Sequence, residues 1–393
     1  MNHWQLARLP QVLFGEGVSQ QLTSLIASYG QRVLLITGAR SFDAQPQSAS
    51  LLAAWQQAGF TLWHERVATE PSPQWVDGCV AQHAEHHIEV VVAIGGGSAL
   101  DAAKAVAGLL TVQRSVMDYL EGVGPELPYT AEALPFIAMP TTAGTGTEAT
   151  KNAVLSQTGE DGFKKSFRHD SLMPRWAVID PSWMLSLPAQ QIAFNGLDAI
   201  TQLIEGYTSS KANDFTDGLA LAGLEKGLVA LPRWFDNSQD AQAASDMAYS
   251  ALLSGIVLAH AGLGAVHGLA APLGAFFPAP HGAVCGILLA ECTAMNIEQL
   301  QAQQPESETL ARYARIGRLL MNDPTLSDAS AQLLLVEQLR QWHQDFALPG
   351  LSRFGVTHQE ISRVVANARG NSMKTNPILL SDEQLTQILF RCL

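Results

Sequence analysis

Residues 90–98 read VVVAIGGGS, an uninterrupted apolar run followed at once by three glycines and a serine. An apolar run of this length predicts a central strand of a parallel sheet, because helices cover such strands on both faces. Glycines directly after a strand let a phosphate approach the backbone, and the start of the next helix, expected over 99–110, supplies N–H donors. The segment predicts a diphosphate-binding loop, although a tight strand-to-helix turn has the same composition.

The first half of the chain repeats this alternation of short apolar runs and helical patterns. Segments 33–36, 136–139 and 177–179 are expected strands, and 48–59 has the pattern of a helix. Such alternation is typical of parallel strands joined by crossover helices. We therefore expect an N-terminal α/β domain built on a parallel sheet.

The second half has a different composition. Beyond Pro188 the β-branched runs disappear, and segments such as 217–229 and 246–260 are rich in alanine and leucine. Prolines at 181 and 188 bracket a short connection between the two halves. The sequence predicts an α/β dinucleotide-binding domain over 1–184 and an all-helical domain over 185–393.

Composition excludes several classes of partner. A formal net charge of -13 opposes binding to nucleic acid, whose phosphates require Lys and Arg. The four cysteines are scattered without a Cys-x-x-Cys pair, which indicates neither a disulfide framework nor a cysteine zinc cluster. The start of the chain lacks the pattern of a signal peptide, so we expect a cytoplasmic protein. Segment 247–290 carries no formal charge, but its prolines and histidines favour buried helices around a site over a membrane span.

A second polar loop follows the expected strand at 136–139. Its sequence, TTAGTGTE over 141–148, is dense in small hydroxyl residues that can bind ribose, phosphate or amide groups. Ligands of open α/β folds lie at the carboxyl edge of the sheet. Two such loops on one sheet favour a dinucleotide, whereas each loop alone could be an exposed turn.

Candidate metal ligands lie in the helical half. Asp198 and Gln202 are four residues apart and share a helix face, and His267 and His281 follow in the charge-free stretch. A carboxylate and two imidazoles are suitable ligands for a divalent first-row metal, with one position open for substrate. A single buried histidine is more often only hydrogen-bonded, but the set together favours a metal site.

In order along the chain, the motifs GGGS, PTTAGTGTE, GLDAxTxxIE, GxxHG and PHG resemble the iron-containing alcohol dehydrogenase family over nearly the whole sequence. The resemblance implies an N-terminal dinucleotide-binding domain, a helical domain and hydride transfer between an alcohol and NAD or NADP in the cleft between them. It implies a small-molecule alcohol or aldehyde substrate and one divalent metal, iron or zinc. We also expect a homodimer or a higher homo-oligomer.

The resemblance assigns roles position by position. The diphosphate would be held by Gly95, Gly96, Gly97 and Ser98, with Asp101 just beyond them. The rest of the cofactor would contact Thr141, Thr142, Thr145 and Lys164. Three of the family's four metal positions fall on Asp198, His267 and His281, and Gln202 stands where the fourth, a histidine, is usual.

Two departures from the family pattern leave alternatives open. Gln202 could be a weak fourth ligand or a hydrogen-bonding group beside the metal. Ala271 replaces a histidine near the substrate, so we expect water and a cofactor ribose hydroxyl to carry the proton outward, with His260 as an alternative relay. The rival functions are a glycerol-type polyol dehydrogenase with three metal ligands and a non-catalytic nucleotide-binding protein that has lost its metal. After the strand at 33–36, Gly38 replaces an acid common in NAD-preferring relatives, and Arg40 could pair with the 2′-phosphate of NADP.

Overall fold

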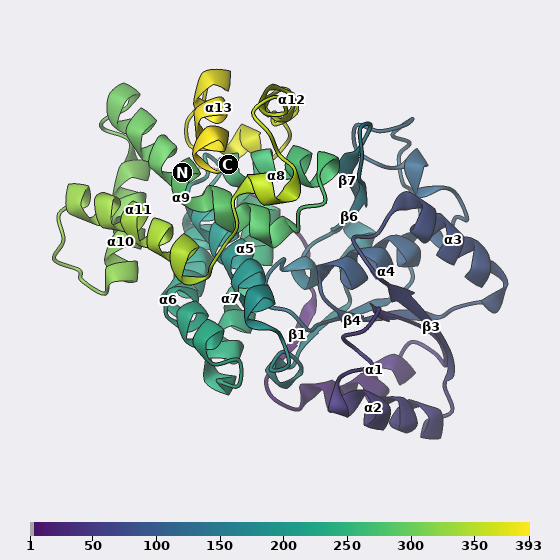
Figure 1. The fold of residues 1–393 in the computed structure, drawn as a ribbon. Helices are drawn as coiled ribbons and strands as arrows, with labels where there is room; N and C mark the ends of the chain where they lie inside the picture. The colour runs from purple at the N-terminus through teal and green to yellow at the C-terminus, as the bar shows by residue number, and fades with distance from the viewer. Residues whose placement is uncertain (1–3) are drawn as a thin grey trace. The chain divides into compact units, whose positions relative to one another are not determined.

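The computed structural model describes residues 4–393 (Figure 1). The chain forms two compact units. One comprises Ala7–Gln157 and Lys164–Leu187, and the other comprises residues 4–6, 158–163 and Pro188–Leu393. The helical unit thus resumes at Pro188, a few residues after the expected boundary, and it also includes two short segments from the first half that the sequence did not point to.

A six-stranded parallel sheet forms the first unit, with strand order β1-β8-β5-β4-β2-β3. The strands are β1 (Gln11–Phe14), β2 (Arg32–Gly38), β3 (Thr61–Val67), β4 (Val90–Gly95), β5 (Phe136–Pro140) and β8 (Trp176–Ile179). Every residue of β4 and β5 is buried, as their apolar sequences predicted. The sequence did not predict the edge strands β1 and β3, because the apolar run of β1 is only three residues long and β3 mixes polar with apolar residues.

Helices α1 (Leu22–Ala27), α2 (Pro46–Gln57), α3 (Pro73–His83) and α4 (Gly97–Leu109) connect these strands. Helix α4 begins inside the glycine run, and every residue from Ala99 to Leu109 is buried. A separate two-stranded sheet pairs β6 (Asn152–Gln157) with β7 (Phe163–Arg168). The expected fold class of the first half, an α/β domain with a parallel sheet, is confirmed.

The second unit is helical, and residues 188–393, all described, contain no strand. Its helices are α5 (Ala189–Thr208), α6 (Asp214–Asp236), α7 (Ala241–Ala261), α8 (Ala265–Phe276), α9 (His281–Gln303), α10 (Glu308–Met321), α11 (Asp328–Asp345), α12 (Ile361–Ala366) and α13 (Asp382–Arg391). Helix α5 is buried from Gly196 to Thr208 and packs against α6, α7 and α9. Within this buried part, the polar side chains of Thr201, Gln202 and Glu205 have hydrogen-bond partners inside the unit.

The charge-free stretch 247–290 forms most of α7, all of α8 and the start of α9. By length and hydropathy α9 could cross a membrane, and the bent pair α7 and α8 would be a second candidate. However, 78% of the most apolar window of α9 is buried inside the protein, as in the core helix of a globular unit. The stretch therefore supplies buried helices, which is the arrangement that its prolines and histidines favoured.

Candidate functional site

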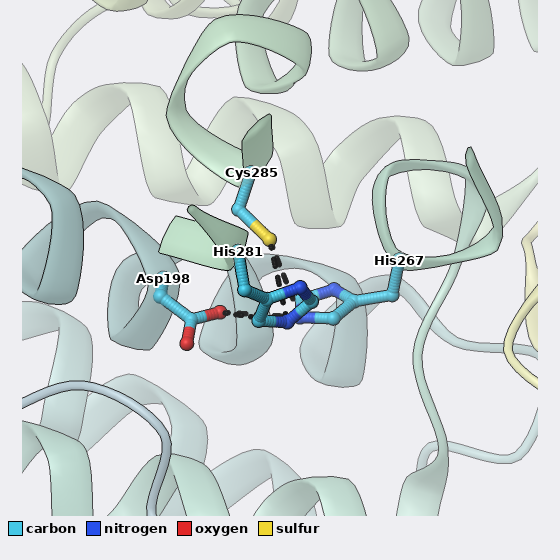
Figure 2. A group of neighbouring side chains, drawn as sticks. All are labelled: Asp198, His267, His281 and Cys285. Atoms are coloured by element: carbon cyan, nitrogen blue, oxygen red, sulfur yellow. Dashed lines mark hydrogen bonds and ion pairs between the residues drawn. The ribbon is translucent and has the colours of Figure 1, made fainter. Parts of the chain in front are cut away.

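Four side chains with metal-binding atoms gather in the helical unit (Figure 2). Asp198 lies on α5, His267 on α8, and His281 and Cys285 on the first turns of α9. One ligand atom from each residue lies within 4.8 Å of all the others. The structure thus brings Asp198, His267 and His281 together from three helices, and it adds a thiol that the sequence did not indicate.

The cluster is dense and buried. Asp198 Oδ1 lies 3.3 Å from Nε2 of His267 and 3.9 Å from Nε2 of His281. Burial alone would raise the pKa of Asp198, but the two imidazoles and a hydrogen bond from Gln202 lower it to about 2. A carboxylate that stays ionised beside two imidazoles is a suitable anionic ligand for a divalent cation.

Glu205 orients His267. Its Oε2 lies 2.6 Å from Nδ1 of His267, and its Oε1 accepts the N–H of Val266 at 2.7 Å. With Nδ1–H donated to the carboxylate, Nε2 is left with its lone pair toward the cluster, as metal-binding histidines require. Glu205 was not predicted from the sequence, although its spacing of seven residues from Asp198 on α5 places both on one helix face.

Gln202 contacts the cluster through its amide group, and its side-chain oxygen is hydrogen-bonded to a residue outside the cluster. Its Oε1 accepts a hydrogen bond from Ser254 Oγ at 2.8 Å, and its amide group bonds to Asp198. Of the two roles open to this residue, these contacts support the hydrogen-bonding one.

His260 and Ala271 lie outside the cluster. His260, at the end of α7, places Nδ1 2.7 Å from the carbonyl oxygen of Ile256 and packs edge-on against Phe215. Ala271 lies on α8, partly buried, and has no polar side-chain atom. Neither residue belongs to the group of candidate metal ligands.

In the first unit, the two polar loops lie against each other at the carboxyl ends of β4 and β5. The N–H of Thr141 donates to the carbonyl of Gly95 at 2.9 Å. A Cβ added at Gly97 would lie 2.7 Å from Thr145 Cγ2, and one at Gly96 would lie 3.3 Å from Thr142 Cγ2. Only glycines leave room here, so the expected diphosphate residues and the threonine loop form one continuous surface.

The start of α4 is suited to an anion. Gly96 is its N-cap and provides no side-chain cap, and the N–H groups of Ala99 and Leu100 already donate to its carbonyl, so the N–H groups of Gly97 and Ser98 are the ones suited to a ligand. Gly38 ends β2 beside this loop, since a Cβ on Gly95 would approach the Gly38 nitrogen to 3.3 Å. Arg40 follows it with an exposed side chain.

Two buried charged residues of α4, Lys104 and Asp101, lie next to this surface. Lys104, fully buried on α4, donates to the carbonyls of Thr147 and Asn152 and to Thr150 Oγ1 at 2.9–3.0 Å. Lys104 was not predicted from the sequence, because a lysine in the middle of an apolar helix does not indicate which groups it contacts. Asp101, one turn earlier, lies 4.0 Å from Lys104 Nζ.

Lys164, the expected cofactor lysine, lies on β7 and is paired in this structure. Its Nζ donates to Glu70 Oε1 at 2.6 Å, and Glu70 also accepts from Ser156. A cofactor contact by Lys164 therefore stays a prediction, and it requires the ammonium to serve Glu70 and the ligand together.

Burial raises the pKa of Glu148 to about 7, against the lowering effects of its own backbone and of Lys104. The folded protein therefore keeps a proton that the unfolded chain loses from about pH 4.5, and stability should fall as the pH rises toward 7. Glu148→Gln removes this loss, on the order of 3 kcal/mol across the window. Urea unfolding at pH 5 and pH 8 should show a flatter profile for this variant and an unchanged one for the exposed Glu132→Gln. An equally steep profile in both variants would contradict the assignment.

Comparisons with known proteins agree with both halves of the chain. Residues 10–181 match the family described as iron-containing alcohol dehydrogenase, and residues 192–393 match the C-terminal part of the Fe-containing alcohol dehydrogenase family. Alcohol dehydrogenase 4 of Saccharomyces cerevisiae (strain YJM789) is 30% identical over 383 residues, which cover 97% of this chain and 96% of that protein. The 4-hydroxybutyrate dehydrogenase of Cupriavidus necator is 33% identical over 320 residues, or 80% of each chain.

A solved structure shows the same fold. The archaeal halo-thermophilic alcohol dehydrogenase from a Red Sea brine pool superposes with a TM-score of 0.91 at 25% identity, covering 100% of this chain and 99% of that one. The resemblance found in the sequence is confirmed. The matched proteins are alcohol dehydrogenases, which agrees with the expected function of metal-dependent hydride transfer between a nicotinamide cofactor and an alcohol or aldehyde. This chain belongs to the iron-containing alcohol dehydrogenase family.

Proposed function

We propose that this protein is an NAD(P)-dependent alcohol dehydrogenase or aldehyde reductase that uses one divalent metal ion. The observation that supports it most is the convergence of Asp198, His267 and His281, with Glu205 behind His267. A buried carboxylate that lies 3.3 Å and 3.9 Å from two imidazole nitrogens is a ligand set suited to a divalent metal ion. The same set favours this function over a nucleotide-binding protein that has lost its metal.

The residues present fit a divalent ion. Asp198 supplies an ionised oxygen, and His267 and His281 both present Nε2 toward it. When bound, the ion supplies Lewis acidity that favours loss of the alcohol proton and polarises a carbonyl. Glu205 keeps His267 in the required tautomer, and Gln202 holds Asp198 in place through its amide group.

The glycine loop and the start of α4 serve the cofactor. Gly95, Gly96 and Gly97 admit a diphosphate to the backbone, and the N–H groups of the helix start donate to it. Thr142 and Thr145 line the same surface with hydroxyl groups. Lys104 fixes the loop that carries them, so that their positions are set before the cofactor binds.

The test is elemental analysis of protein purified without chelator, combined with a turnover screen. The screen should cover short alcohols, diols, hydroxy acids and aldehydes, each with NAD(H) and NADP(H). We expect one divalent ion per chain and turnover that chelator removes and metal restores. A protein that binds NAD(P)H but neither metal nor substrate would support the non-catalytic alternative. A cytoplasmic location and a homo-oligomeric state stay predictions. Light scattering would measure the oligomeric state.

Cofactor choice gives a separate prediction. Arg40→Ala should lower kcat/KM with NADPH by about ten- to a hundredfold, since a charged hydrogen bond is worth roughly 1.5–3 kcal/mol, and should leave NADH nearly unaffected. Arg32→Ala, at the opposite end of β2, is the matched control and should change neither value. A strong preference for NADH that Arg40→Ala does not alter would show that Arg40 is only a solvated charge.

A further inference from the structure

Cys285 is placed to bind the same ion as the three expected ligands. It lies one helical turn after His281 on α9, so both side chains share a helix face. Its side chain is fully buried, and Sγ lies 3.8 Å from Nε2 of His267 and 3.8 Å from Nε2 of His281. Figure 2 shows the sulfur directed at the two imidazoles, on the side that Asp198 does not occupy.

These separations suit a single central ion. Zinc lies roughly 2.0–2.2 Å from nitrogen or oxygen and about 2.3 Å from sulfur, which gives tetrahedral edges of about 3.3–3.6 Å between ligand atoms. Four of the six separations are 3.3 Å between His267 and Asp198, 3.8 Å for each of the two sulfur contacts, and 3.9 Å between His281 and Asp198, and all six lie within 4.8 Å. Small inward movements would bring all four atoms to bonding distance.

The usual fourth position does not compete with Cys285. On α5 that position is Gln202, whose oxygen accepts from Ser254 and whose amide bonds to Asp198. A carboxamide oxygen held in this way is a poorer ligand than a thiolate for a soft or borderline ion. The donor that α5 lacks is therefore available from α9.

We propose that Cys285 Sγ is a direct ligand of the ion, completing an Asp–His–His–Cys set that selects zinc over iron and to which the substrate oxygen would bind as a fifth ligand. The inference rests on the proposed metal site and specifies its chemistry. The thiol proton passes to solvent as the sulfur binds, because the thiolate is the ligand form. A tetrahedral set that contains thiolate and imidazole is typical of zinc.

Cobalt(II) tests the proposal without relying on activity. Apoprotein of the full chain is titrated with cobalt(II) and its absorption recorded, because a thiolate on cobalt produces an intense near-ultraviolet charge-transfer band and histidine or carboxylate does not. The unaltered protein should develop this band at one cobalt per chain. Cys285→Ala should lose the band, bind cobalt at least about tenfold more weakly, and retain a larger share of iron when loaded from an equal zinc and iron(II) mixture.

Cys292→Ala is the matched control, because Cys292 is buried on the same helix outside the cluster and its loss should leave the band intact. Stoichiometric cobalt binding by the unaltered protein without the band would overturn the inference and leave the proposed function standing. Failure to bind cobalt, zinc or iron at all would overturn both. If Cys285→Ala does not fold, the spectrum of the unaltered protein still shows whether a thiolate binds the cobalt ion.

Discussion

His267→Ala should abolish tight metal binding and lower kcat/KM by at least about a thousandfold, which corresponds to roughly 4 kcal/mol of transition-state stabilisation. The substitution removes the ligand closest to Asp198, at 3.3 Å. It also leaves Glu205 Oε2 without the imidazole N–H that it contacts at 2.6 Å, inside a buried cluster. Metal content by elemental analysis and steady-state kinetics with added metal are the measurements.

His260→Ala is the control for this variant. His260 bonds to the backbone of its own helix and lies outside the ligand cluster, so its loss should keep activity within about tenfold, or 1.4 kcal/mol. If activity fell by orders of magnitude and an ionisation disappeared from the pH profile, His260 would be the proton relay that Ala271 cannot be. Full turnover by metal-free His267→Ala would refute the metal-dependent mechanism.

Glu205→Gln should weaken metal binding by about ten- to a hundredfold, the usual effect of losing a carboxylate behind a ligating histidine. A glutamine has one acceptor oxygen, whereas Glu205 uses one for the N–H of Val266 and the other for Nδ1 of His267. One of these donors therefore loses its partner, and the tautomer of His267 is no longer fixed. Competition with a chelator measures the affinity of the variant for the metal. Its kcat should fall because only part of the protein is loaded with metal.

The control exchanges an acid for an amide on the surface of the same unit. Glu291 on α9 pairs with Arg340 and Arg391, so Glu291→Gln should change metal affinity by less than about twofold. Equal affinity in Glu205→Gln and the unaltered protein would mean that the imidazole is held by packing instead of by the carboxylate.

The fold was predictable where strand, turn and helix are encoded within one short segment. The glycines after β4 and the apolar runs of β4 and β5 were identifiable because strand, turn and helix start are consecutive. The edge strands β1 and β3 were not predicted, because few of their residues are buried.

The cluster of candidate metal ligands was only partly predictable from the sequence. Asp198, His267 and His281 were recognised from motifs and residue type, but Cys285 was dismissed because the four cysteines form no closely spaced pair. Criteria based on cysteine spacing find sites built from one segment, whereas this sulfur meets ligands from three helices that only the tertiary fold brings together. Its position four residues after His281 was the available signal.

The hydrogen bonds that Lys104 donates to residues 147–152 affect how the cofactor would bind. Ordering a loop backbone costs roughly 1–2 kcal/mol for each residue that loses its freedom, and a loop that becomes ordered only with its ligand subtracts that cost from affinity. Here the carbonyls of Thr147 and Asn152 are already held by a fully buried ammonium. The loop is therefore preorganised at the expense of folding stability, and cofactor association can proceed as docking onto a rigid surface, with little heat capacity change from loop closure.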